Sequence, residues 1–237
     1  MTGVRRLAAW AVHLYTASGA VCAFFALEAA SRGSLRAAFL WLAVQVAIDS
    51  SDGALARLVG VKAVLPDIDG NRLDDIVDYL TYVFVPAVIV VTAGVVPPPL
   101  GWVVASAMLL SSAFGFSSAQ AKTDDHFFTG FPSYWNVVVL YLVAFRGPVV
   151  TNALILLVLA VLVFVPLRYL YPSRTPVLRP VTVALGLVWA LLMLGVVASL
   201  PDPPRALLYP SLVFPAYYVG LSLVLDHRRR ATGGRVA

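Results

Sequence analysis

The sequence is poor in charge and in cysteine. Only 12% of its 237 residues are charged, against about 25% in an average soluble domain, which excludes an ordinary soluble protein. The single cysteine, Cys22, lies in an apolar stretch, so an intramolecular disulfide is excluded and a packed thiol is expected. Internal repeats and low-complexity segments are absent, and the linkers are too short to hold a second domain. We therefore expect one integral membrane domain over residues 1–237.

Most of the chain consists of long stretches of apolar residues. They make up 60% of the chain, and the mean hydropathy is +0.87. Because a membrane helix needs about 20 apolar residues, these stretches predict an all-α polytopic membrane protein with about eight transmembrane helices. We expect the helices at residues 7–30, 34–57, 71–96, 99–120, 134–146, 149–168, 179–200 and 206–226, of which the fifth is short.

The basic residues predict the orientation of these helices. If the N-terminus is cytoplasmic and the chain crosses the membrane eight times, most Lys and Arg residues fall on the cytoplasmic side, as the positive-inside rule requires. These residues are Arg5, Arg6, Arg57, Lys62, Arg72, Lys122, Arg168, Arg174, Arg179, Arg228, Arg229, Arg230 and Arg235. The C-terminus is then cytoplasmic as well. The basic residues serve as topology signals and lipid contacts, and they do not indicate nucleic-acid binding.

The acidic residues are concentrated in one short part of the chain. Seven of the twelve lie where the second predicted helix ends and the third begins, facing the cytoplasm: Asp49, Asp52, Asp67, Asp69, Asp74, Asp75 and Asp78. Carboxylates beside lipid are costly, so a cluster of this kind indicates a functional site.

Four of these aspartates form two pairs, and the spacing within each pair places both residues on the same face of a helix. Asp49 and Asp52 are three residues apart, and Asp74 and Asp78 are four apart, so each pair shares one face of a helix. Antiparallel packing of the two helices brings the pairs together, and cations between them would relieve their repulsion. Oxygen ligands without Cys or His favour Mg²⁺ or Mn²⁺, and two such ions form a known clamp for phosphoryl transfer. The remaining aspartates, Asp67, Asp69 and Asp75, are expected to cap helices or to face water.

This spacing resembles the signature of the CDP-alcohol phosphotransferase family. The matching positions are Asp49, Asp52, Gly53, Ala56, Arg57, Gly70, Asp74 and Asp78. The chain departs from the commoner pattern in its longer spacer, residues 58–69, between Arg57 and Gly70. A wider match, concentrated in residues 45–90, is closest to the bacterial phosphatidylcholine synthase branch of the family.

The resemblance implies a fold, a reaction and a set of residue roles. It implies a six-helix core in a bacterial inner membrane, a homodimer, and transfer of the phosphatidyl group of CDP-diacylglycerol to choline with release of CMP. It implies that two divalent ions, Mn²⁺ or Mg²⁺, are held by Asp49, Asp52, Asp74 and Asp78. Asp78 would also take the proton from the acceptor hydroxyl. The CDP-lipid site would be lined by Gly53, Ala56, Arg57 and Gly70.

Aromatic residues near the acidic cluster are candidates for binding choline. A quaternary ammonium donates no hydrogen bond, so its recognition relies on aromatic faces and negative charge. The candidates are Tyr82, one turn beyond Asp78, then Tyr79, and then Tyr134 and Trp135 after the polar segment that holds Asp124 and Asp125. Tyr and Trp also collect at membrane interfaces for purely physical reasons, which is the competing explanation.

Two other functions remain open on the sequence alone. The acceptor alcohol could be serine, inositol phosphate or glycerol phosphate, although a phosphorylated acceptor would want more basic residues than Lys62, Arg72 and Lys122 provide. From a different class, a membrane cation transporter would use the aspartates as ligands at the bilayer midplane. The aspartates lie toward the ends of their helices, which disfavours transport.

Overall fold

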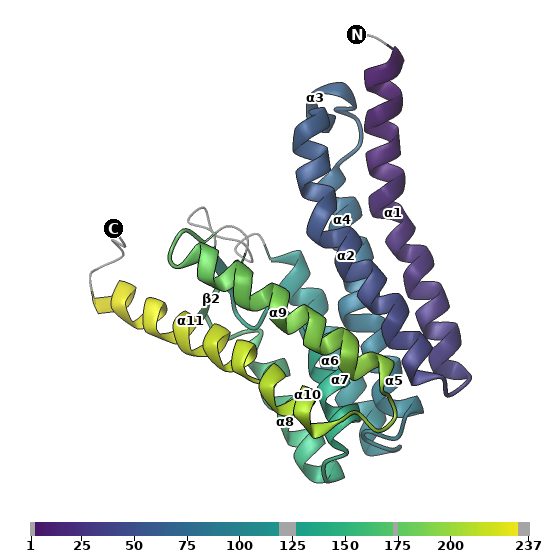
Figure 1. Ribbon diagram of the computed structural model, residues 1–237, viewed down its shortest axis with the longest axis vertical. Coiled ribbons are helices and arrows are strands. Elements are labelled where there is room, and N and C mark those ends of the chain that lie inside the picture. The colour runs from purple at the N-terminus through teal and green to yellow at the C-terminus, as the bar shows by residue number, and fades with distance from the viewer. Residues whose placement is uncertain (1–2, 119–126, 173–174, 232–237) are drawn as a thin grey trace.

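The computed structural model describes residues 3–118, 127–172 and 175–231 and is almost entirely helical (Figure 1). Each of the eight predicted helices has a counterpart. These are α1 (Gly3–Ser31), α2 (Leu35–Val59), the continuous stretch α4 (Gly70–Asp78), η1 (Tyr79–Phe84) and α5 (Val85–Thr92), then α6 (Leu100–Ser117), α7 (Trp135–Phe145), α8 (Val149–Leu162), α9 (Arg179–Ala198), and α10 (Arg205–Ser211) with α11 (Val213–Ala231).

The helices have the surface of a membrane protein. Within the described residues, five helical stretches are long and apolar enough to cross a membrane: Gly3–Ser31, Gly70–Thr92, Leu100–Ser117, Arg179–Ala198 and Arg205–Ala231. Large apolar side chains point outward on them, such as Leu14, which is 72% exposed, and Leu191, which is 71% exposed. Water would penalise such surfaces and lipid accepts them. The all-α polytopic fold that the sequence predicts is therefore confirmed.

Three details differ from the prediction. The sixth helix ends at Leu162, earlier than expected, and α7 and α8 have 11 and 14 residues. A short strand, β1 (Phe127–Thr129), precedes α7, and another, β2 (Arg168–Leu170), follows α8. The two strands pair antiparallel. The third predicted helix changes at Tyr79 from an α-helix to a π-helix, η1, and returns to an α-helix at Val85.

Small residues let α1 pack closely against its neighbours. Ala23, Ala26 and Ala30 of α1 are buried in the main core, which also contains Ala38 and Leu42 of α2. Gly19 has no room for a side chain, because a Cβ atom there would lie 2.0 Å from Oε1 of Gln45 and 2.5 Å from Cγ1 of Val77. Close approach through small residues is the usual way in which membrane helices associate. It places α1 against both α2 and α4.

The spacer between the two halves of the signature folds as a short helix and a loop. The helix is α3 (Val61–Val64), and it follows Gly60, which ends α2 at a φ of 72° in the left-handed region. Val61, Val64 and Leu65 form a small core with Ala9 and Val12 of α1. The extra length of the spacer is thus absorbed against the N-terminal part of α1, at the top of the view in Figure 1.

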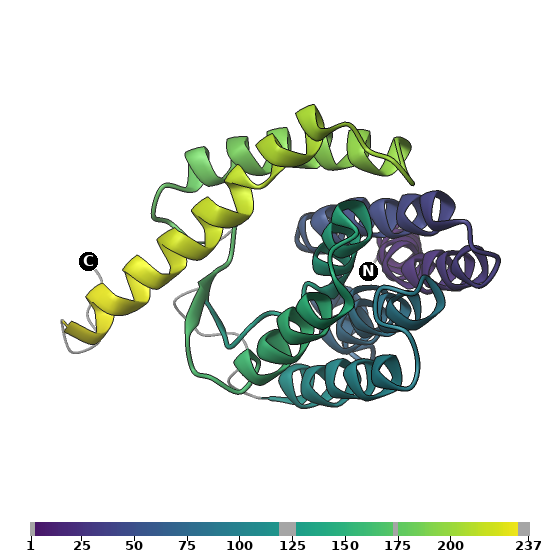
Figure 2. The same ribbon diagram turned by 90° about the horizontal axis from the view of Figure 1, so that it is seen from below.

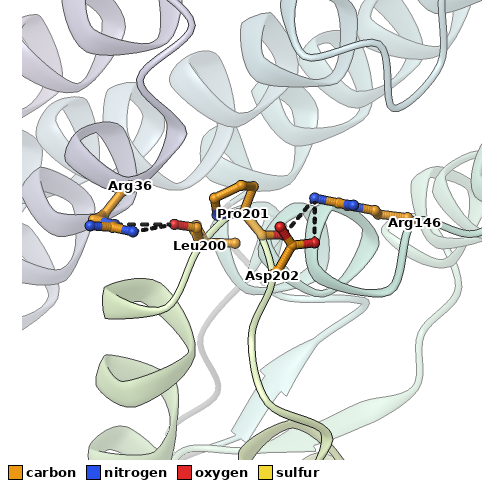
Figure 3. Close-up of polar contacts among 5 residues, drawn as sticks. All are labelled: Arg36, Arg146, Leu200, Pro201 and Asp202. Carbon is orange, nitrogen blue, oxygen red and sulfur yellow. Dashed lines mark hydrogen bonds and ion pairs between the residues drawn. The ribbon is translucent and has the colours of Figure 1, made fainter.

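The C-terminal helices α9, α10 and α11 form a layer beside the bundle of the earlier helices (Figure 2). The loop between α9 and α10 fixes this layer to the bundle through two arginines (Figure 3). Nε and Nη2 of Arg36, on α2, donate to the carbonyl of Leu200 at 3.1 and 2.6 Å. Nη2 of Arg146, at the end of α7, donates to the carbonyl of Pro201 at 2.8 Å and lies 2.9 Å from Oδ1 of Asp202.

Candidate metal centre

Three aspartates from two helices converge in the structure. Asp49 comes from α2, and Asp74 and Asp78 come from α4, one helical turn apart. One carboxylate oxygen of each lies within 4.8 Å of the others, and all three side chains are half-buried. The helix faces that the spacing predicts do therefore meet, and they bring together residues that lie 25 and 29 positions apart in the sequence.

The three carboxylates could hold a metal ion. Oxygens bound to one ion at about 2.1 Å are separated by no more than about 4.2 Å, so a group within 4.8 Å needs only small side-chain movements to close on an ion. The donor set is made of carboxylate oxygen alone, which suits a hard divalent cation. The concentration of negative charge beside apolar helices is explained if a cation binds here.

Asp52, the fourth predicted ligand, lies outside this group of three and is buried. Its Oδ2 accepts a hydrogen bond of 2.8 Å from the hydroxyl of Thr16 on α1, and the two side chains are each 7% exposed. The residue before Thr16 on α1, Tyr15, shares a hydrogen bond of 2.9 Å with Ser51, the neighbour of Asp52. The α1 helix therefore contacts the acidic end of α2 at two polar positions.

Tyr82 reaches the carboxylate group from the π-helical segment. Its hydroxyl donates to Oδ2 of Asp49 at 2.8 Å, and the side chain is 9% exposed. A π-helical turn is rare and is often found at functional sites, because it changes which side chains share a face. Here the segment starts directly after Asp78, and its residue Tyr82 reaches the group formed by α2 and α4.

The small and basic residues of the signature surround the acidic end of α2 and the start of α4. Nη1 of the exposed Arg57 lies 3.3 Å from where a Cβ atom of Gly53 would be, so the guanidinium folds back over that glycine. A Cβ atom at Gly70 would lie 3.2 Å from Cε1 of His13 on α1. Ala56 packs against the small core formed by α1 and α3.

The four candidate choline-binding aromatic residues differ in their contacts. Tyr134 lies beside Tyr82, with ring centroids 6.1 Å apart, and also contacts Phe128 of β1 and Tyr218 of α11, at 6.4 and 6.3 Å. Tyr79 points elsewhere, because its hydroxyl donates to the carbonyl of Leu109 on α6. Trp135 is fully buried, and its Nε1 donates to Oγ of Ser112 at 2.7 Å. Tyr82 therefore contacts the carboxylate group, and Tyr134 lies beside Tyr82.

Of the aspartates that the sequence predicts to cap a helix or to face water, Asp69 and Asp67 do so in the structure. The side chain of Asp69 caps α4 by accepting hydrogen bonds from the backbone N–H groups of Asn71 and Arg72. Asp67 is exposed, and Asp75 is not part of the group of three. Lys122, Asp124 and Asp125 lie outside the described residues.

Sequence reasoning missed two residues that contact the signature, Thr16 and His13, and a third, Tyr218, that contacts Tyr134. Thr16 and His13 lie on α1, far from the motif, and Tyr218 lies on α11. No local pattern marks them, because their position depends on how α1 packs on α2 and α4 and how α11 packs on β2. The spacing of His13, Thr16 and Gly19 at three-residue intervals is the one available signal, since it places them on one helix face.

The polytopic helical fold and the carboxylate group between α2 and α4 define an integral membrane protein with an acidic candidate metal centre. Among curated proteins, the chain is 40% identical to the phosphatidylcholine synthase of Legionella bozemanae over 77% of this chain and 88% of that one. It is 38% identical to that of Rhizobium meliloti over 83% and 82%, and 35% identical to that of Pseudomonas aeruginosa over 94% of each. No protein-family model matches. The chain belongs to the phosphatidylcholine synthase family.

Proposed function

We propose that the protein is a membrane transferase of phospholipid biosynthesis that makes phosphatidylcholine from CDP-diacylglycerol and choline and releases CMP. The observation that carries the proposal is the convergence of Asp49, Asp74 and Asp78 at the spacing of the CDP-alcohol phosphotransferase signature. The relatives support choline as the acceptor, since each of those named above is a phosphatidylcholine synthase.

In the proposed reaction, the choline oxygen attacks the β-phosphorus of CDP-diacylglycerol. The new P–O bond forms as the P–O bond to CMP breaks, and CMP leaves. The Asp78 carboxylate takes the proton of the choline hydroxyl, which is the work of a general base. Bound divalent ions would supply the positive charge that neutralises the diphosphate.

The residues of the signature fit the donor. We propose that Asp49, Asp74 and Asp78, together with Asp52, hold Mg²⁺ or Mn²⁺, and that two ions bind when the diphosphate is present. Gly53 leaves the backbone of α2 accessible, and the guanidinium of Arg57 above it is suited to a phosphate oxygen. Ala56 and Gly70 keep the adjoining surfaces small.

The candidate binding site for the acceptor choline lies beside the carboxylates. We propose that the quaternary ammonium of choline binds against Tyr82 and Tyr134, whose rings lie together next to Asp49. Aromatic faces and a nearby negative charge are what such a cation requires. Tyr79 and Trp135, whose polar atoms bond to α6, are weaker candidates.

The proposed location is a bacterial inner membrane, with both termini and the carboxylate group on the cytoplasmic side. The basic C-terminal run Arg228–Arg230 at the end of α11 supports this orientation. The homodimer that the family resemblance implies stays a prediction, as does the single domain.

A direct assay tests the proposed function. The purified protein is supplied with CDP-diacylglycerol and Mn²⁺, and CMP release is measured with choline, serine, inositol and glycerol phosphate in turn. We expect CMP release with choline. Release with another acceptor would correct the acceptor, and no CMP with any of them would overturn the transferase.

A further inference from the structure

Helix α1 carries a row of three residues that face the signature motif, although α1 itself is not part of the motif. His13, Thr16 and Gly19 are spaced three apart, so they share a face. His13 lies against Gly70 of α4, Thr16 bonds to Asp52 of α2, and Gly19 lies against Gln45 of α2 and Val77 of α4. The first contact in this row is to a glycine of the signature, and the second is to one of its aspartates.

The middle contact of the row is polar and buried. The hydroxyl of Thr16 donates to Oδ2 of Asp52 at 2.8 Å and also lies 3.4 Å from the carbonyl of Val12. A hydrogen bond to an ionised carboxylate is stronger than one between neutral groups, and burial strengthens it further. It therefore fixes the direction in which the Asp52 carboxylate points.

The contacts on either side hold Thr16 at this register. Gly19 allows the backbone of α1 to approach α2, since a larger residue would overlap Gln45. The imidazole of His13, 7% exposed, occupies the space above Gly70 where a side chain would otherwise be. A rotation or shift of α1 would disrupt both contacts, that of Gly19 with Gln45 and that of His13 with Gly70. The position of the Thr16 hydroxyl is thus determined by packing on both sides.

We propose that Thr16 is a positioning residue of the metal centre: its hydroxyl orients the Asp52 carboxylate so that the free oxygen serves as a ligand beside Asp49, Asp74 and Asp78. This proposal rests on the proposed function, because it requires Asp52 to bind the ion. Partners that orient a metal ligand typically change metal affinity about 10- to 100-fold when they are removed. Helix α1 would then contribute to the metal centre without supplying a ligand.

The chain offers a closely matched control in Thr182 of α9. Its hydroxyl shares a hydrogen bond of 2.8 Å with Tyr217 and bonds the carbonyl four residues earlier, Leu178, as Thr16 bonds Val12. Thr182 is 2% exposed and lies on a helix that contributes nothing to the carboxylate group. Replacing each threonine by valine removes one hydroxyl and keeps the shape of the side chain.

The experiment measures Mn²⁺ binding to the detergent-purified full chain by electron paramagnetic resonance, alongside CMP release as a function of Mn²⁺. We expect Thr16→Val to weaken Mn²⁺ binding about 10- to 100-fold. Thr16→Ser, which keeps the hydroxyl, and Thr182→Val should bind Mn²⁺ like the wild type. In an Asp52→Asn background, Thr16→Val should cause no further loss, because the carboxylate that it orients is gone. If the valine variant does not fold, Thr16→Ala takes its place.

The outcomes separate this proposal from the proposed function. If the wild type binds Mn²⁺ and releases CMP but Thr16→Val binds the ion equally well, the positioning role is wrong and the transferase stands. Equal weakening by Thr182→Val, or a further loss in the Asp52→Asn background, would also overturn the positioning role. If the wild type binds no Mn²⁺, the proposed metal centre fails, and the role of Thr16 fails with it.

Discussion

The hydroxyl of Tyr82 donates a 2.8 Å hydrogen bond to Oδ2 of Asp49 and so joins the π-helical segment η1 to the acidic end of α2. The bond takes one oxygen of a carboxylate that belongs to the candidate metal centre. Tyr82 therefore has two separable properties, a hydroxyl that orients Asp49 and a ring that adjoins Tyr134. The first prediction separates them.

We expect Tyr82→Phe to raise the Mn²⁺ concentration needed for half-maximal CMP release about 10-fold or more, because a carboxylate ligand loses its orienting partner. The KM for choline should change little, since the ring remains. Tyr82→Leu should raise both quantities. The matched control is Tyr79→Phe, which removes a hydroxyl bonded to the carbonyl of Leu109 and should leave the metal requirement unchanged. A choline KM that rises in Tyr82→Phe would contradict this division of roles.

The second prediction concerns the general base. Asp78→Asn should lower the rate of CMP release by at least about 100-fold, because the amide cannot accept the proton of the acceptor hydroxyl. CDP-diacylglycerol binding, measured separately by isothermal titration, should persist. Asp75→Asn changes an aspartate on the same helix that lies outside the group of three, and it should retain activity. Near-normal turnover by Asp78→Asn would rule out the assignment.

The third prediction follows from the donor set. Removing divalent ions with a chelator should stop CMP release, and adding Mn²⁺ or Mg²⁺ should restore it, because oxygen ligands favour hard cations. Zn²⁺ should restore it poorly. Asp49→Asn and Asp74→Asn should each require more metal for half-maximal rate. Full activity after exhaustive chelation, checked by metal analysis of the same sample, would exclude the metal centre.

The fourth prediction tests the fit of α1 on α4. Gly70→Ala introduces a Cβ atom 3.2 Å from Cε1 of His13, so the ring must move. We expect the free energy of unfolding to fall by about 1 kcal/mol, the lower end of the cost of overpacking. In a His13→Ala background the same change should cost less, since contacting residues are not additive. Thermal unfolding in detergent measures both.

Gly220→Ala is the control for that pair. A Cβ atom at this position in α11 meets nothing within 4 Å, so the substitution should not destabilise the protein. If Gly70→Ala lowers the free energy of unfolding by the same amount in the wild type and in the His13→Ala background, the two residues are not coupled.

The fifth prediction concerns the attachment of the C-terminal layer. Arg36→Met removes both hydrogen bonds to the carbonyl of Leu200 and keeps the apolar stem. We expect faster amide hydrogen exchange in α9 and α10, with a local cost of about 1 kcal/mol because the arginine is partly exposed. The control is Arg32→Met, which breaks an exposed ion pair between Arg32, just after α1, and Glu28 of α1. It should leave the hydrogen exchange of α9 and α10 unchanged. A uniform change across all helices would argue against a local role for Arg36.

The sequence predicts those parts of the molecule that depend on local pattern. Apolar stretches located all eight helices, and the spacing of Asp49, Asp74 and Asp78 identified the residues that converge. The π-helix over Tyr79–Phe84 does not follow from the sequence pattern, because no residue in that segment is a helix breaker. The pairing of β1 with β2 joins segments about 40 residues apart through three residues each, and such short strands leave no periodic signal.

The contacts of Thr16, His13 and Tyr218 lie beyond sequence reasoning for a related cause. Each depends on the rotation of one helix relative to another, and composition does not determine that rotation when most of the helix surface is apolar. Helix α1 has alanine and glycine on several faces, so its contact face could be chosen only once α2 and α4 were placed. The candidate ligands are visible in the sequence, while the residues that contact them become visible in the structure.

The spacer of twelve residues between Arg57 and Gly70 has a consequence for how such proteins diverge. Its helix α3 rests on α1 and contributes no carboxylate to the group of three, so its length can change while α2 and α4 keep their relative position. We therefore expect insertions there to lengthen the interval between the two halves of the signature without moving Asp49 away from Asp78. The interval in the sequence is therefore a property of the connection between α2 and α4, and a motif definition that fixes it would exclude proteins with the same arrangement of acids.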